Sequence, residues 1–141
     1  MIEKIIKENC VLATIIKSAF KAEGIVFFTA PELPQQMGYM NRPKGYLINA
    51  HRHNHEEIVV KQSCETLIVR KGSVKVFLYD EADNFFAETT IETGDVMLLS
   101  GYGHGFEMLE DSELIEIKQG PYSGDQYNLP LNVHSTKSCH G

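Results

Sequence analysis

The chain has 141 residues, of which 43% are hydrophobic and 23% are charged, and these are the proportions of an ordinary soluble globular protein. We expect one domain over residues 1–141, long enough to bury a core. The formal net charge of −6 argues against nucleic acid and anionic membrane as partners, because both favour a basic surface.

The sequence shows no sign of a membrane span or of secretion. It has no run of about 18 apolar residues, and the charged stretch from Met1 to Lys7 does not resemble a signal peptide. Its three cysteines, Cys10, Cys64 and Cys139, are odd in number and widely spaced, which suits reduced thiols better than a disulfide framework. These features predict a cytoplasmic protein.

The N-terminal region gives mixed signals. Residues Met1 to Ala22 fit an amphipathic helix, but Val11–Ile16 also fits a buried strand. Ile25–Thr29 is β-branched and aromatic enough to be a strand. If both are strands, we expect them to extend an outer sheet and to support a dimer. A proline-containing loop should follow, ending in a turn at Arg42–Gly45.

The stretch Gly45–His55 contains three histidines at alternate positions, His51, His53 and His55. Apolar and β-branched neighbours favour an extended backbone, in which alternate side chains point to the same face. Neutral imidazole is a preferred ligand of borderline transition metals, so three on one face indicate a metal site. The alternative is a solvent-facing polar row on an edge strand.

From Tyr46 to Gln119 short strand patterns alternate with turn signals. Further strands are predicted at Glu65–Arg70, Val74–Tyr79, Phe85–Ile91, Val96–Leu99, His104–Met108 and Glu113–Lys118. The first two flank Lys71–Ser73 and are expected to form a hairpin. Regular short strands without helical interruption indicate an all-β antiparallel sandwich or barrel. Residues 126–141 are expected to form a loose tail.

The segment 45–72 resembles the first sequence motif of the cupin superfamily. That motif begins with glycine, five residues and His-x-His, and here Gly45 is followed by five residues and His51-Arg-His53. It ends with glutamate, six residues and glycine, and here Glu65 is followed by six residues and Gly72. The gap between the two halves is eleven residues, longer than the usual three or four.

The segment 94–108 resembles the second cupin motif, which begins with glycine and reaches its metal-binding histidine through a glycine-bearing turn. Gly94 and the turn Gly101–Gly103 lead to His104 in this way. The motif's proline and final asparagine are absent, and Met108 stands at the place of the asparagine. Both motifs are similar to those of small single-domain bacterial cupins, which implies a double-stranded β-helix (jelly roll).

The resemblance implies a metal site. Its ligands would be His51, His53, Glu65 and His104, holding one divalent transition metal ion per chain, such as zinc, nickel, iron or manganese. His55 is an additional candidate ligand, and Glu57 stands where a shorter gap would place the glutamate. Three imidazoles and one carboxylate leave coordination positions open, as in a catalytic site.

The resemblance also implies a cavity in the mouth of the barrel. Alternate strand residues are expected to line it, namely Leu67, Val69, Val76 and Phe106, whereas Cys64 should face the opposite way. Glu116 and Lys118 form either a pair that lines the cavity or an exposed surface pair.

Further residues are candidate substrate contacts, catalytic groups or ligands. By resemblance, Tyr39, Arg42 and Tyr122 are candidate substrate contacts, and Glu57, Tyr39 or Arg42 would supply proton transfer or anchoring as catalytic residues. His134, Cys139 and His140 could suggest a second metal site, although incidental residues in a polar tail are the better interpretation.

From these features we expect a metal-dependent cupin enzyme that acts on a small oxygenated molecule, such as a sugar derivative or a keto acid, by dioxygenase- or isomerase-type chemistry. One alternative is a non-enzymatic module that binds a small ligand or a metal. Another is a metal-free cupin of the sugar-nucleotide isomerase kind, in which histidine does the acid–base work. The expected partners are a small-molecule ligand and a second copy of the chain in a homodimer. The ligand set does not define the reaction, because one fold hosts many chemistries.

Overall fold

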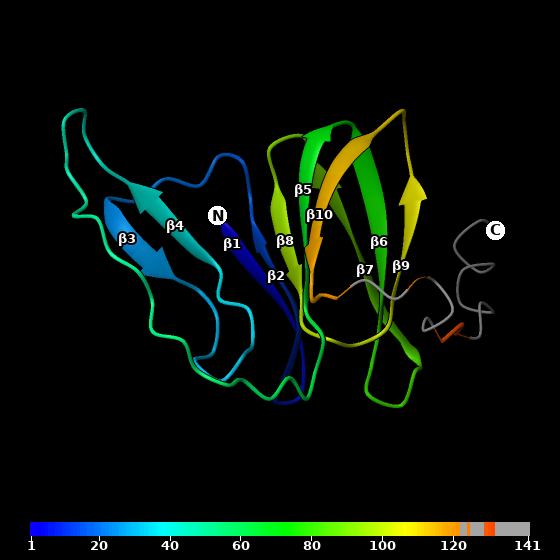
Figure 1. Cartoon of the computed structure of the whole chain (residues 1–141). Coiled ribbons are helices and arrows are strands. Elements are labelled where there is room, and N and C mark those ends of the chain that lie inside the picture. The colour runs from blue at the N-terminus through cyan, green and yellow to red at the C-terminus, as the bar shows by residue number, and fades with distance from the viewer. Residues whose placement is uncertain (122–123, 125–128, 132–141) are drawn as a thin grey trace.

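The computed structural model describes residues 1–121, 124 and 129–131. In this part of the chain the protein is all-β, with strands that pair antiparallel. The strands are β1 (Ile2–Lys7), β2 (Cys10–Ile16), β3 (Gly24–Phe27), β4 (Gly38–Asn41), β5 (Glu65–Lys71), β6 (Ser73–Tyr79), β7 (Phe85–Glu92), β8 (Val96–Leu99), β9 (His104–Met108) and β10 (Glu113–Lys118) (Figure 1). Nowhere in the described ranges is there a helix that could cross a membrane.

Two sheets pack face to face as a β-sandwich (Figure 1). One has five strands in the order β1-β2-β8-β5-β10, and the other has three in the order β7-β6-β9. Aliphatic side chains from both sheets fill the space between them, namely Leu12, Ala13, Ile15, Leu67, Val69, Val74, Val76, Leu78, Ile91, Met97 and Leu99. This core confirms the predicted antiparallel sandwich.

Three residues that were predicted to line a cavity lie in the core instead. Leu67, Val69 and Val76 are at most 3% exposed and pack in the core cluster. The prediction that these three line the cavity is wrong, because the two sheets approach closely enough for their aliphatic side chains to interdigitate. Phe106, in the middle of β9, does line the cavity as predicted.

The N-terminus forms strands. β1 and β2 pair as a hairpin, and β2 then pairs with β8, Ala13 lying opposite Leu99. Leu12 to Ile15 are all buried, so this run is covered on both faces, as in an interior strand. The helix alternative for Met1–Ala22 is therefore wrong.

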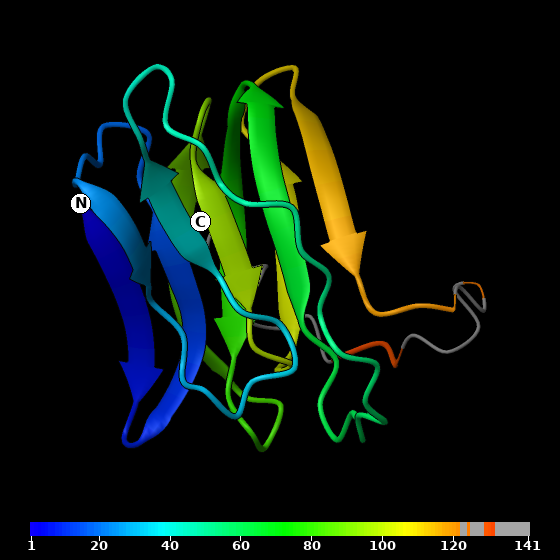
Figure 2. The same cartoon turned by 60° about the vertical axis from the view of Figure 1, so that its left-hand side comes forward.

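A two-stranded ribbon of β3 and β4 stands beside the sandwich (Figure 2). β4 was not predicted, because its four residues lie in a proline-containing region. The expectation that Ile25–Thr29 extends an outer sheet is wrong, since β3 pairs with β4 alone. The connection between them packs Leu33 and Met37 against Leu98 on the outer face of the five-stranded sheet.

The predicted histidine strand is absent. No residue from 42 to 64 belongs to a strand, and residues 42–61 are all exposed. A strand needs a neighbour for its backbone hydrogen bonds, and this segment pairs with none of the described strands. The side chains of His51–Glu57 are polar or charged and exposed, so water can hydrogen-bond to this segment in place of a neighbouring strand.

The predicted hairpin at Lys71–Ser73 is also wrong, since β5 and β6 belong to different sheets. The chain crosses between them at Gly72, whose φ is +102°. A Cβ at Gly72 would lie 2.7 Å from the Asp111 carbonyl oxygen and 2.8 Å from the Ser112 Cα. Glycine is therefore required both for the backbone angle and for the close approach of the β9–β10 turn.

Candidate functional site

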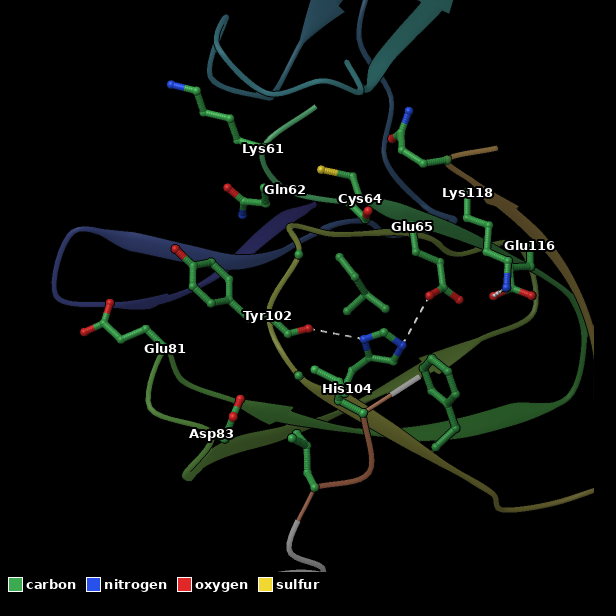
Figure 3. Close-up of a pocket in the computed structure, with 18 of the residues that line it drawn as sticks. Lys61, Gln62, Cys64, Glu65, Glu81, Asp83, Tyr102, His104, Glu116 and Lys118 are labelled. Carbon is green, nitrogen blue, oxygen red and sulfur yellow. Dashed lines mark hydrogen bonds and ion pairs between the residues drawn. The ribbon is translucent and has the colours of Figure 1, made fainter. Parts of the chain in front are cut away.

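A cavity lies at the end of the sandwich where β5 and β9 begin and β10 ends (Figure 3). Its volume is ≈ 1100 Å³. The strands contribute Glu65, Leu99, His104, Phe106, Glu116 and Lys118, and the turns before and after them contribute most of the remaining lining. The core ends at this point, and ionisable side chains take over the inward-facing positions.

Strand register explains why these polar groups meet. In the β5–β10 pair Lys118 lies opposite Glu65, and Glu116 lies opposite the core residue Leu67. Side chains alternate along a strand, so Glu116, Lys118 and Glu65 share the inner face with the core. On the other sheet, His104 lies opposite Leu78, another core residue.

An ion pair between Glu65 and His104 forms the centre of the site (Figure 3). His104 Nε2 lies 3.2 Å from Glu65 Oε2, with side chains 29% and 14% exposed. The other ring nitrogen, Nδ1, lies 3.3 Å from the Tyr102 carbonyl oxygen. The Phe106 ring packs at a tilt against the imidazole, with 5.2 Å between ring centroids. Both nitrogens therefore have an acceptor, an arrangement that suits the doubly protonated ring.

Burial and pairing act in opposite directions on the two charges. Burial lowers the pKa of His104, but the hydrogen bond and the charge of Glu65 outweigh it and hold that pKa above its usual value. Burial likewise raises the pKa of Glu65, but hydrogen bonds from His104 and Glu116 outweigh it and hold that pKa below its usual value. Both shifts favour an imidazolium beside a carboxylate.

A second carboxyl group lies next to this pair. The hydrogen bond to Glu65, assisted by burial, raises the pKa of Glu116. Lys118 Nζ lies 3.7 Å from Glu116 Oε1, and the two side chains are 43% and 45% exposed. Glu116 and Lys118 thus form a pair that lines the cavity and remains open to solvent, which combines the two alternatives left by the sequence.

Residues of the surrounding turns complete the rim, and the sequence did not identify them. Tyr102 and Gln62 line the cavity together with Glu81, which accepts a hydrogen bond of 3.3 Å from the Cys10 thiol. A hydrogen bond with Cys10 and burial raise the pKa of Tyr102. The sequence signal that could have identified Tyr102 as a site residue is its position as an aromatic residue between two glycines.

The loop histidines lie elsewhere. His51, His53 and His55 are exposed and do not line the cavity. The rings of His51 and His53 meet edge to face with centroids 5.4 Å apart, and His51 Nδ1 lies 2.8 Å from the Asn49 carbonyl oxygen. Of the four implied ligands, the structure brings together Glu65 and His104.

As arranged, these donors do not fit a metal ion. Among the described residues, no group of three or more histidine, cysteine, aspartate or glutamate side chains is placed to hold one. Glu65 and His104 also use their facing atoms to bond each other. A metal bound here would require further ligands from a segment that lies outside the cavity in this structure.

The three candidate catalytic residues do not line the cavity. Tyr39 packs edge-on against Phe20, with ring centroids 5.0 Å apart. The Arg42 guanidinium lies 4.5 Å from the centroid of the Tyr46 ring, and Glu57 is exposed on the loop. Tyr122, His134, Cys139 and His140 lie outside the described residues, as does most of the expected tail.

Cys64 packs with Met37 and Leu98 on the outer side of the sheet, as expected for a residue next to Glu65, and it also contributes to the lining of the cavity. Comparisons with protein families, curated proteins and solved structures found no match. No relative therefore indicates what the site does, and its chemistry follows from its own side chains. A half-buried histidine and two carboxylates in a cavity open to solvent can donate and accept protons.

Proposed function

We propose that the protein binds a small oxygenated molecule in this cavity and transfers protons on it, with His104 as the acid and Glu65 as the base. The observation that supports this most directly is the 3.2 Å pairing of His104 Nε2 with Glu65 Oε2 inside a cavity of ≈ 1100 Å³. Paired groups whose environment sets their protonation states in opposite directions are typical of acid–base sites.

The proposed reaction is an isomerisation at a carbon next to a carbonyl group. The carboxylate of Glu65 takes the proton from that carbon, while His104 gives a proton to the carbonyl oxygen. Glu65 then gives its proton to the former carbonyl carbon, and His104 takes the proton of a hydroxyl group on the first carbon, which becomes the new carbonyl group. Both residues return to their starting protonation states, and the isomerisation is complete. Atoms and electrons balance without an oxidant or a reductant.

We also propose that the sandwich is a double-stranded β-helix of the cupin kind. The glycine that ends the first motif and the one that begins the second support this, because Gly72 and Gly94 both have positive φ, +102° and +89°. The residues that carry each motif's chemistry, Glu65 and His104, open β5 and β9 and face the same cavity.

A second candidate function is the metal-dependent reaction implied by the resemblance. It is favoured by one observation, that His51 and His53 lie with their rings 5.4 Å apart on the segment that continues into Glu65. Closure of that segment over the cavity would add imidazole ligands to Glu65 and His104. The metal would polarise a substrate oxygen.

Hydrogen exchange in D₂O tests the first proposal without knowledge of the product. An acid–base site replaces the hydrogen next to a carbonyl with deuterium, and proton NMR of simple sugars and keto acids follows its loss. Chelator-treated protein should catalyse exchange in at least one of these compounds, and His104→Gln should slow it by about 100-fold or more.

The matched control is His51→Ala, which alters a histidine outside the cavity and should leave exchange unchanged. Exchange that persists in His104→Gln, or its absence with every compound, would contradict the proposal. Exchange that needs added metal and is lost in His51→Ala would establish the second candidate instead. Binding without exchange would indicate a non-enzymatic binding module.

A further inference from the structure

Carboxylates outnumber cations around the cavity. The described lining contains five of them, on Glu65, Asp80, Glu81, Asp83 and Glu116, against two lysines and one histidine, and Asp80 is paired with Lys7 at 2.7 Å. The net charge of −6 over the whole chain adds a field of the same sign. The lining therefore carries a small excess of negative charge, which disfavours the approach of an anion.

The cations nearest the centre are already matched. His104 lies 3.2 Å from Glu65, and Lys118 lies 3.7 Å from Glu116. A phosphate or carboxylate that approached either cation would meet its carboxylate partner at a short distance, where repulsion between like charges is strong. An uncharged ligand avoids this cost.

One residue of the cavity lining, Gln119, has a buried acceptor atom without a hydrogen-bond donor in the described part of the chain. Gln119 follows β10 and lines the cavity, and its Oε1 is buried without a hydrogen-bond partner among the described residues. A buried acceptor left without a donor costs free energy, which a ligand hydroxyl would recover. This acceptor therefore favours a ligand that carries hydroxyl groups, and the charge of the lining is what distinguishes a free sugar from a sugar phosphate.

From the excess of acceptors and the paired cations, we infer that the ligand of this cavity is an uncharged, hydroxyl-rich molecule, a free sugar as opposed to a sugar phosphate, a sugar nucleotide or a keto acid. This inference rests on the proposed function for the location of the site and adds the class of substrate. The carbonyl group of an open-chain sugar is the group on which His104 and Glu65 act.

Binding measured by ligand-observed NMR titration tests the substrate class. The probes are glucose, xylose and fructose, each beside a charged counterpart such as glucose 6-phosphate or gluconate. We expect at least one free sugar to bind and its charged counterpart to bind about tenfold more weakly or worse. Tighter binding of the charged form, or no binding of any free sugar, would overturn the inference.

Two variants of Gln119 test the acceptor. Gln119→Leu removes it and should weaken sugar binding about tenfold, whereas Gln119→Glu retains an acceptor and should bind within about threefold of the native protein. Thermal unfolding of both variants checks that they are folded. Equal binding by Gln119→Leu and the native protein would contradict the role of the amide oxygen.

Failure of this inference is distinguishable from failure of the proposed function. Sugar binding without deuterium exchange would retain the ligand class and refute proton transfer. Exchange of keto acids that depends on His104, without binding of free sugars, would retain proton transfer and refute the ligand class.

Discussion

His104 and Glu65 hold each other in their charged forms within a partly buried cavity. Each pays a desolvation cost, and each recovers it through the hydrogen bond of 3.2 Å between them. The raised pKa of His104 therefore depends on the carboxylate of Glu65. At the residue scale, each group of the pair shifts the pKa of the other towards the charged form.

Replacing Glu65 with glutamine should lower the pKa of His104. The substitution removes the charge that favours the imidazolium and leaves the burial that disfavours it. A pH titration of the His104 ring protons by NMR would measure the change, with Glu57→Gln on the exposed loop as the matched control. An unchanged His104 pKa in Glu65→Gln would mean that the pair does not form in solution.

Asp95 has a structural role at the same scale. Its buried carboxylate accepts hydrogen bonds from Lys17 Nζ at 2.7 Å and from the backbone nitrogens of Ser18 and Glu92 at 2.8 Å each. Burial raises the pKa of Asp95, but these hydrogen bonds outweigh it and hold that pKa below its usual value. Asp95 thus connects the end of β2 to the turn between β7 and β8.

Asp95→Asn should therefore lower the free energy of unfolding by about 2–4 kcal/mol at pH 7. Because the folded pKa lies below the unfolded one, the stabilisation is present above the unfolded pKa and is lost as pH falls through the folded value. Urea unfolding should show a difference from the native protein that shrinks below about pH 4. A difference that is constant with pH, or equal to that of the exposed control Asp111→Asn, would refute this role.

At the scale of elements, the strands of the second half were predictable and the segment 42–64 was not. Period-two patterns and glycine turns define β5 to β10, where each apolar face has a sheet opposite to bury it. Tyr46–Ile48 and Ile58–Val60 show similar local patterns but remain exposed. A local pattern does not reveal whether a neighbouring strand is available for pairing, and without such a neighbour the segment does not form a strand.

A substitution at Gly72 tests the crossing of the chain from β5 in one sheet to β6 in the other. Gly72→Ala should lower the free energy of unfolding by about 2–3 kcal/mol, because alanine is strained at a φ of +102° and its Cβ would contact Asp111 and Ser112. Gly105→Ala is the control, since its Cβ would make an ordinary contact with Phe77 at 3.8 Å. Equal and small effects in urea unfolding would show that the corner is not held as described.

At the scale of the whole molecule, the cavity exists because two sheets end together. Glu65 and His104 were identified in the sequence through their motif positions, and the structure brings them within 3.2 Å. Gln62, Tyr102 and Gln119 could not be identified in that way, because they lie in connections that meet only when the sandwich closes. Sequence patterns report on strands, whereas the rim of a cavity depends on the tertiary arrangement of the turns.

The central claim is that Glu65 and His104 work as a proton-transfer pair and not as members of a shared metal site with the loop histidines. Elemental analysis tests it after the native protein, His51→Ala and His104→Gln have been loaded with zinc, nickel, iron or manganese and then dialysed. We predict that any metal retained is the same in the native protein and in His104→Gln. One tightly held ion per chain that is lost in both variants would contradict the claim, because it would require the loop and β9 to meet around a metal.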